Sequence, residues 1–193
     1  MADRTGSVAN GEERVRGFWN DCAERLIARV ETPAAAEAST AFAQALSGST
    51  PLQFEPRWLE ALDTLKLLDP TPLGERFVDV APLLHWEPTS RADDNGADFA
   101  LANVGQLRDA AALTAGIMFV RAGRQYPLHH HPHEHEVYLT IAGHANWRFG
   151  GHEDFRTIDP DTTIYNHPGD LHSAIAGDTP LVAFYVLWED RDR

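Results

Sequence analysis

The chain has 193 residues and a hydrophobic content of 43%, which is sufficient for the core of one domain with an extension. Its 29 acidic and 16 basic residues give a net charge of -13, which disfavours nucleic acid and anionic membranes as partners because both would repel it. The single cysteine, Cys22, excludes an internal disulfide, and its helical surroundings indicate a buried structural thiol. The N-terminus has no apolar signal region and no apolar run reaches membrane-spanning length, so we expect a cytoplasmic protein.

Helical patterns occupy the first third of the chain. From Glu12 to Glu31 the apolar residues recur at three- and four-residue steps, which is typical of one face of a helix. Thr32 and Pro33 have the residue types of an N-cap and a first helical position, and predict a second helix through Leu46 that ends at Ser47–Ser49. A third short helix is expected over Pro56–Leu68.

After the prolines of Asp69–Pro72 the pattern changes to short segments rich in β-branched and aromatic residues, separated by turn residues. Such a series predicts a small antiparallel barrel or sandwich. We therefore expect residues 1–70 to form a helical segment that packs on a barrel of residues 71–193, with a solvated loop over Arg91–Gly96. The predicted strands are Arg76–Val80, Asp98–Val104, Leu113–Arg121, Glu134–Ala142, Asn146–Phe149, Thr162–Asn166 and Leu181–Trp188.

Histidines and a glutamate gather in the sequence GRQYPLHHHPHEHEVYLTIAG. His129, His131 and Glu136 lie in this stretch, and His172 follows in HPGDLH. Imidazole and carboxylate ligands without a thiolate suit Fe, Mn, Co, Ni or Zn and leave coordination positions for a substrate. The sequence therefore predicts that these four residues bind a divalent transition metal.

Strand geometry places a condition on this metal site. On a regular strand His129 and His131 point the same way, as do Glu136 and Tyr138, but the odd step between the two pairs puts them out of phase. Because proline cannot donate a ladder hydrogen bond, we expect a bulge or short loop at Pro132–His135.

Other histidines offer alternatives. His133 and His135 define a competing register on the face opposite the glutamate, and we expect them at the rim. His144, His152 and His167 have no distinctive spacing and are expected to be structural or peripheral. A histidine-rich run can also be a solvated segment that binds metal adventitiously.

The spacing of glycine, two histidines, glutamate and glycine from Gly123 to Gly143 matches the first motif of the cupin superfamily without a mismatch. The second cupin motif is met in part. Gly169 and His172 fit, whereas His167 stands at the usual proline position and Ala176 replaces the expected asparagine. The resemblance implies a cupin barrel, a small antiparallel double-stranded β-helix.

Within the cupins, Phe99–Trp188 resembles the dimethylsulfoniopropionate (DMSP) lyases of marine bacteria, which also have helices before a C-terminal barrel. The residues that carry this resemblance are Tyr126-Pro127, His131-Pro132, Glu136-Val137-Tyr138, Gly143–Trp147, Pro180-Leu181 and Phe184–Trp188. The resemblance implies a carbon–sulfur lyase that removes the proton alpha to the substrate carboxylate and releases dimethyl sulfide and acrylate by β-elimination.

The resemblance also implies roles for single residues. Tyr138 would be the catalytic base, and Tyr126 would help bind or act on the substrate. The four metal ligands would be His129, His131, Glu136 and His172. Members of the family differ in which residues contact the metal, and Tyr138 is a further candidate ligand. Alternatively, Tyr138 is an aromatic residue of the barrel core.

A sulfonium group cannot donate a hydrogen bond, so we expect aromatic faces to recognise it through cation–π attraction. The candidate substrate-binding aromatics are Tyr126, Trp147, Tyr165, Tyr185 and Trp188. Two other interpretations stay open, because the same ligand set supports many reactions. One is a different metal cupin enzyme, an oxygenase or an isomerase, and the other is a cupin that binds a ligand without catalysis. The apolar faces of the first two helices would serve either to form a homodimer or to pack on the barrel, and a homodimer is the expected partner state.

Overall fold

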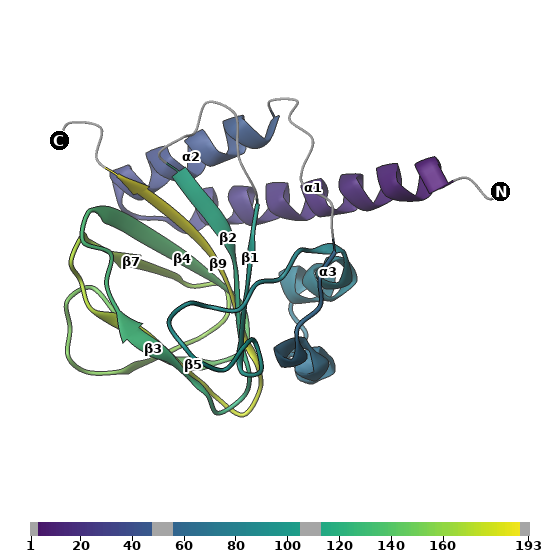
Figure 1. Ribbon diagram of the computed structural model, residues 1–193. Coiled ribbons are helices and arrows are strands. Elements are labelled where there is room, and N and C mark those ends of the chain that lie inside the picture. The colour runs from purple at the N-terminus through teal and green to yellow at the C-terminus, as the bar shows by residue number, and fades with distance from the viewer. Residues whose placement is uncertain (1–3, 48–55, 105–112, 190–193) are drawn as a thin grey trace.

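Two antiparallel sheets face each other in the computed structural model, and helices cover the outer face of one of them (Figure 1). The structure describes residues 4–47, 56–104 and 113–189. The helical elements come first in the chain. They are α1 (Arg4–Arg29), α2 (Pro33–Ser47), the 3-10 helix η1 (Glu60–Leu67), α3 (Pro72–Val80) and the short 3-10 turn η2 (Ala81–Leu83). None of the described helices is both long enough and apolar enough to cross a bilayer.

The strands follow. The five-stranded sheet has the order β1-β2-β9-β4-β7, and the four-stranded sheet has the order β3-β8-β5-β6, with antiparallel pairing throughout. This is the cupin barrel that the resemblance implied, preceded by helices. The bounds are β1 (Phe99–Asn103), β2 (Leu113–Val120), β3 (Gln125–His129), β4 (Glu134–Ala142), β5 (Ala145–Arg148), β6 (Arg156–Ile158), β7 (Thr163–Asn166), β8 (His172–Ala176) and β9 (Leu181–Glu189).

The five-stranded sheet is buried on both faces, and alternate residues of each strand serve different cores. On β9, Val182, Phe184 and Val186 pack under the helices, whereas Tyr185 and Leu187 face the barrel interior. This two-sided burial explains why β9 is a continuous apolar run rather than an alternating one.

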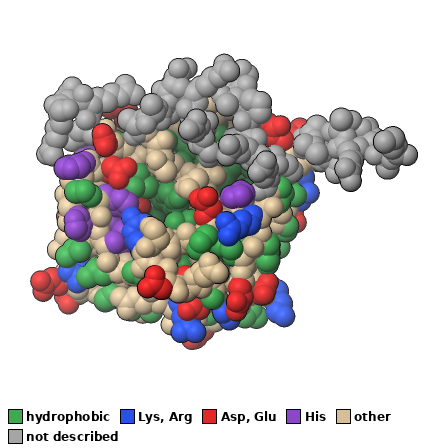
Figure 2. Space-filling model, viewed as in Figure 1, with side chains coloured by type: hydrophobic (Ala, Val, Ile, Leu, Met, Phe, Trp, Pro, Cys, Tyr) green, Lys and Arg blue, Asp and Glu red, His purple; other side chains and the backbone are tan. Residues whose placement is uncertain are grey.

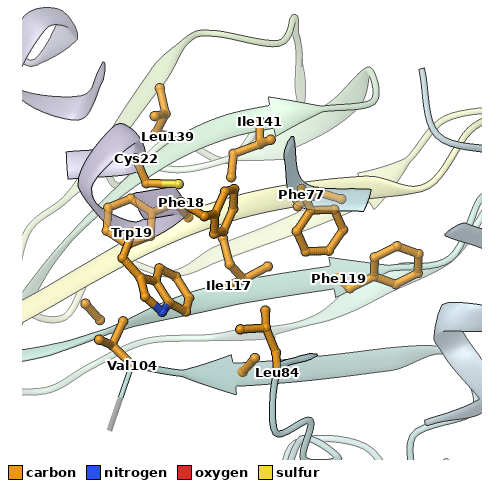
Figure 3. Packing of buried hydrophobic residues seen from close by; sticks show 14 of the residues in the cluster. Phe18, Trp19, Cys22, Phe77, Leu84, Val104, Ile117, Phe119, Leu139 and Ile141 are labelled. Atoms are coloured by element: carbon orange, nitrogen blue, oxygen red, sulfur yellow. The ribbon is translucent and has the colours of Figure 1, made fainter. Parts of the chain in front are cut away.

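The outer core lies between this sheet and the helices (Figure 3). Phe18, Trp19 and Cys22 of α1 face residues of the sheet there. The ring of Trp19 lies 6.0 Å from that of Phe184, and the ring of Phe18 lies 6.0 Å from that of Phe77 on α3. These aromatic contacts hold the helices against strands whose other face forms the pocket.

The first two predicted helices are confirmed, and the first extends further toward the N-terminus than Glu12. Gly48 and Ser49, where the second helix was expected to stop, lie outside the described residues. The third predicted helix is present as the 3-10 helix η1. α3 and η2 continue the helical part past residue 70, and the division of the chain at that residue stays a prediction.

The prediction of a strand over Arg76–Val80 is wrong, because this segment belongs to α3. Thr71 caps that helix, accepting a hydrogen bond from Gly74 N at 2.9 Å, and Pro72 occupies the first turn. Phe77 and Val80 are both buried at a helical spacing. The other six predicted strands are confirmed, with ends shifted by no more than one residue. Three strands were missed, namely β3, β6 and β8.

Candidate metal centre and pocket

The barrel brings the four predicted metal ligands together. His129 ends β3 and pairs with His172, the first residue of β8, while Glu136 lies on β4 and His131 in the loop before it. One ligand atom from each of the four residues lies within 4.8 Å of the others. Such a group is able to hold a metal ion.

The expected break in strand geometry is confirmed, although it lies slightly earlier than Pro132–His135. Residues 130–133 form a short loop between β3 and β4, and the register of β3 against β8 also shifts between Tyr126 and His129. Gly169, which has a φ of +85°, donates a hydrogen bond to the carbonyl of His131 at 2.8 Å. This hydrogen bond connects the loop to the HPGD segment, residues 167–170, and thereby fixes the position of the loop.

Hydrogen bonds fix the orientation of all three imidazoles. Nδ1 of His129 lies 2.8 Å from the carbonyl of Pro127, and Nδ1 of His172 lies 2.9 Å from that of Asp170. A carbonyl oxygen only accepts, so both Nδ1 atoms are protonated, and Nε2 is the nitrogen of each ring that could bind a metal. Nδ1 of His131 contacts a carboxylate oxygen of Glu134 at 3.2 Å. Oxygen acceptors at the outer nitrogen are characteristic of metal-binding histidines.

The buried polar atoms at the centre also fit a cation. Glu136 and His172 are 2% and 1% exposed. Oε2 of Glu136 and Nε2 of His172 are buried without a hydrogen bond of good geometry, although they lie 2.9 Å apart. Such atoms are costly in a protein interior unless something compensates them. A divalent ion would satisfy both.

Electrostatics favour the neutral form of His129 and His131 and the ionised form of Glu136, as metal binding requires. Burial, with a contribution from His172, lowers the pKa of His129 to about 3. Burial also lowers the pKa of His131. Burial alone would raise the pKa of Glu136, but the contact with His172, with smaller contributions from His131 and Tyr138, outweighs it and holds that pKa below its ordinary value.

Tyr138 and Tyr126, the predicted catalytic residues, both line the pocket. Burial and the neighbouring Glu136 raise the pKa of Tyr138 well above 10. Burial also raises the pKa of Tyr126, whose hydroxyl lies 3.1 Å from Oγ1 of the buried Thr89. Without an added positive charge, both phenols are therefore neutral at ordinary pH.

A pocket of about 150 Å³ opens beside the metal-ligand cluster, and a cavity of this volume accommodates a molecule the size of benzene. Figure 2 shows histidine side chains gathered at the left edge of this face, next to a basic side chain. The pocket is lined by Arg91, Leu101, Thr114, Met118, Tyr126, His129, His131, Glu136, Tyr138, Tyr185 and Leu187.

Among the charged and aromatic residues of this lining, sequence reasoning treated two incompletely. Tyr185 was only one of several candidate aromatics, although it alternates with Phe184 along β9 and lies opposite Tyr138 in the register. Its hydroxyl donates to Oδ1 of Asn103 at 2.6 Å. Gly116 leaves room for it, because a Cβ there would lie 2.7 Å from the Tyr185 hydroxyl. Arg91 was missed altogether.

The structure does not bring the other candidate aromatics to the pocket. Trp147 is inside the barrel, with its ring 5.0 Å from that of Tyr138, but is not among the lining residues described. Tyr165 and Trp188 lie on the other face of the sheet, with the outer core. His135 is there too, with its Nδ1 2.7 Å from the Tyr165 hydroxyl. Parity along β4 therefore excludes His135 from the centre, as expected.

Four other histidines that the sequence analysis considered lie away from the metal-ligand cluster. His133 and His152 are exposed, and Nδ1 of His144 contacts a carboxylate oxygen of Asp159 at 2.8 Å. The ring of His167 lies 4.8 Å from that of Tyr165. These four histidines are peripheral, as the sequence indicated.

Comparison with known proteins places these features in a family. A sequence profile described as dimethylsulfoniopropionate lyase matches residues 57–183, more than half of the chain. Dimethylsulfoniopropionate lyase DddQ of Ruegeria pomeroyi is 29% identical over 147 residues, which are 72% of this chain and 72% of that protein.

Solved structures agree in fold. The crystal structure of DMSP lyase DddQ from Ruegeria pomeroyi matches with a TM-score of 0.57 and 24% identity, over 82% of this chain and 90% of the other. A chain from the crystal structures of DMSP lyases RdDddP and RnDddQII matches with a TM-score of 0.63 and 18% identity, over 96% and 93%.

Proposed function

Because this chain belongs to the dimethylsulfoniopropionate lyase family, we propose that it cleaves DMSP to dimethyl sulfide and acrylate by base-catalysed β-elimination in the pocket beside the metal-ligand cluster. The chain is a cupin lyase, an enzyme that breaks a carbon–sulfur bond. The observation that carries the mechanism is the convergence of three oriented imidazoles and one buried carboxylate next to the phenol of Tyr138.

His129, His131, Glu136 and His172 would hold a divalent ion, with Fe, Mn, Zn, Co and Ni as the candidates. When bound, such an ion supplies positive charge that stabilises negative charge developing on the substrate carboxylate and favours the phenolate form of Tyr138. The outer hydrogen bonds of the three imidazoles would hold their lone pairs toward the centre.

Tyr138 would act as the general base. Its phenolate oxygen takes the proton from the carbon alpha to the carboxylate, the electron pair of that bond forms the carbon–carbon double bond, and the carbon–sulfur bond breaks. Sulfur keeps the electron pair of that broken bond, so it leaves as neutral dimethyl sulfide. The phenol of Tyr138 returns the proton to solvent after acrylate departs.

Aromatic rings in the pocket would contact the sulfonium end of the substrate. Tyr126 and Tyr185 are both buried and line the pocket with Tyr138. The centroid of the Tyr185 ring lies 6.2 Å from that of Tyr138. Ring faces attract a cation that cannot donate a hydrogen bond, by roughly 0.5–2 kcal/mol per ring.

Headspace detection of dimethyl sulfide tests the proposed function. Purified protein loaded with Fe or Mn should release dimethyl sulfide from DMSP, and Tyr138→Phe should abolish release while metal content and circular dichroism stay unchanged. A metal-loaded wild type that releases no dimethyl sulfide would contradict the proposal and favour an oxygenase or isomerase. The cytoplasmic location and the homodimer stay predictions.

A further inference from the structure

Arg91 is the single basic side chain, other than the histidines, among the described residues that line the pocket. It belongs to a segment that crosses from the helical part of the chain to β1. Two backbone hydrogen bonds between Glu87 and Leu101, of 2.8 and 2.9 Å, attach the start of this segment to the edge of the five-stranded sheet. Arg91, Asp93 and Asn95 are exposed in a loop, as the sequence predicted, and Arg91 also lines the pocket.

The backbone around Arg91 is held on both sides. Before it, Thr89 is 3% exposed, and its Oγ1 accepts a hydrogen bond from Arg91 N at 3.3 Å. After it, the carboxylate of Asp94 accepts hydrogen bonds from the backbone N–H groups of Gly96, Asp98 and Phe99. The backbone at Arg91 thus has a defined position, and the side chain of Arg91 is exposed to solvent.

No Asp or Glu of the described part of the chain forms an ion pair with Arg91, whereas Arg121 and Arg124 share Asp98 nearby. The side chain of Arg91 nevertheless reaches the pocket, which it lines together with Tyr126 and His129. A planar guanidinium without a carboxylate partner matches the geometry of a carboxylate ligand, which it binds through two parallel hydrogen bonds.

We propose that Arg91 binds the carboxylate of the zwitterionic substrate and thereby sets its orientation in the pocket. Like charges repel, so the sulfonium end is kept away from Arg91 and directed to the aromatic rings of Tyr138 and Tyr185. A carboxylate has two oxygens, so binding to Arg91 leaves lone pairs for a second cationic partner. The identity of the substrate rests on the proposed function, but carboxylate binding by Arg91 does not.

Two probes separate the ends of the substrate: propionate carries only the carboxylate, and the trimethylsulfonium ion carries only the cation. Titration calorimetry on metal-loaded protein should show that Arg91→Gln weakens propionate binding roughly 10-fold, whereas trimethylsulfonium binds equally well or more tightly. Arg91→Lys should retain part of the propionate affinity, because it keeps the charge but not the fork.

Arg156→Gln is the matched control, because Arg156 is exposed on β6 away from the pocket lining and its loss changes the net charge equally. It should bind both probes as the wild type does. Propionate binding that is undetectable in the wild type, or that changes less than about twofold in Arg91→Gln, would overturn the proposal. An equal weakening by Arg156→Gln would also overturn it, since the effect would then be one of net charge.

Kinetics with DMSP distinguish this inference from the proposed function. If both hold, Arg91→Gln raises KM for DMSP roughly 10-fold, with a smaller change in kcat. If the wild type releases no dimethyl sulfide but binds propionate in an Arg91-dependent way, the lyase proposal fails and carboxylate binding by Arg91 stands.

Discussion

Oε2 of Glu136 lies 2.9 Å from Nε2 of His172 in the barrel interior, and each of these two side chains is no more than 3% exposed. The two residues come from different sheets, Glu136 from β4 and His172 from β8. The contact between them therefore depends on closure of the barrel. It places two buried polar atoms side by side, and a cation or a proton between these atoms would compensate for their burial.

Removal of either side chain should release the metal. We expect His172→Ala and Glu136→Ala to lower metal bound after dialysis at least about 10-fold, because each removes a direct ligand. Metal per protein is measured by plasma mass spectrometry. His133→Ala is the matched control, since His133 belongs to the same histidine run but is exposed. If His133→Ala lost as much metal as His172→Ala, the assignment of ligands would be wrong.

Metal binding should change the titration of Tyr138. In chelator-treated protein, burial and Glu136 keep the pKa of this phenol well above 10, so no tyrosinate forms there at moderately alkaline pH. A divalent ion should lower that pKa, because it favours the phenolate. The difference in tyrosinate absorbance between wild type and Tyr138→Phe, followed with and without metal, measures this effect. Identical titrations with and without metal would contradict it.

Asp161 links the end of α1 to the barrel through Arg25 and Arg29. Its hydrogen bond to Arg25 is the main cause that holds its pKa below the ordinary 3.8. A carboxyl with a lowered pKa in the folded state stabilises the protein above its unfolded pKa, and this stabilisation is lost as the pH falls through the folded value.

Asp161→Asn should therefore lower Tm by about 1–3 °C near neutral pH, and less at high salt or at a pH acid enough to protonate Asp161. Asparagine tolerates the φ of 68° at this position, so the variant removes the charge without adding backbone strain. Asp154→Asn, at an exposed site, is the control for net charge. A loss of Tm that is independent of salt would argue against the ion pair.

Cys22 should not react with thiol reagents in the native protein. Its side chain is fully buried, and burial is the main cause that raises its thiol pKa well above 9, so the reactive thiolate is scarce. Modification measured with a chromogenic disulfide reagent should be at least about 100-fold slower in buffer than in guanidinium chloride. Rapid modification of the folded protein would show that α1 separates from the sheet.

Tyr165 should tolerate loss of its hydroxyl, because it lies on the helix side of the sheet. We expect Tyr165→Phe to change kcat/KM less than about twofold, even though it removes the contact with Nδ1 of His135. Dimethyl sulfide release at several DMSP concentrations measures this. A fall in kcat/KM as large as that of Tyr138→Phe would restore the prediction that Tyr165 binds substrate.

The metal ligands could be predicted because their spacing is local, with three of the four lying within eight residues of each other. Tyr185 could have been identified from parity alone, since it alternates with the apolar residues that face the helices. Arg91 could not. It reaches the pocket only because Glu87 bridges Leu101 on β1, a long-range contact that no local pattern encodes.

The errors in secondary structure have similar physical causes. The strand predicted over Arg76–Val80 contains Phe77, Val78 and Val80, which favour strands, but a run of five residues is too short to distinguish a strand from a helix. The capping side chain of Thr71 together with Pro72 decides for the helix. β3 was missed because it contains Pro127 and half-exposed residues. β8 was missed because it contains Ser173, Ala174 and Ala176, which are small and do not favour strands.

Alternate residues of β4 face opposite sides of the sheet, and this alternation restricts insertions and deletions in the strand. Glu136 and Tyr138 face the barrel interior, while Val137 and Leu139 face the helices. Deleting or inserting one residue within this strand would exchange the two sets. A carboxylate would then face the aromatic core beneath α1, and an aliphatic side chain would face the pocket. Evolution can therefore vary the residue types of this strand far more readily than their number.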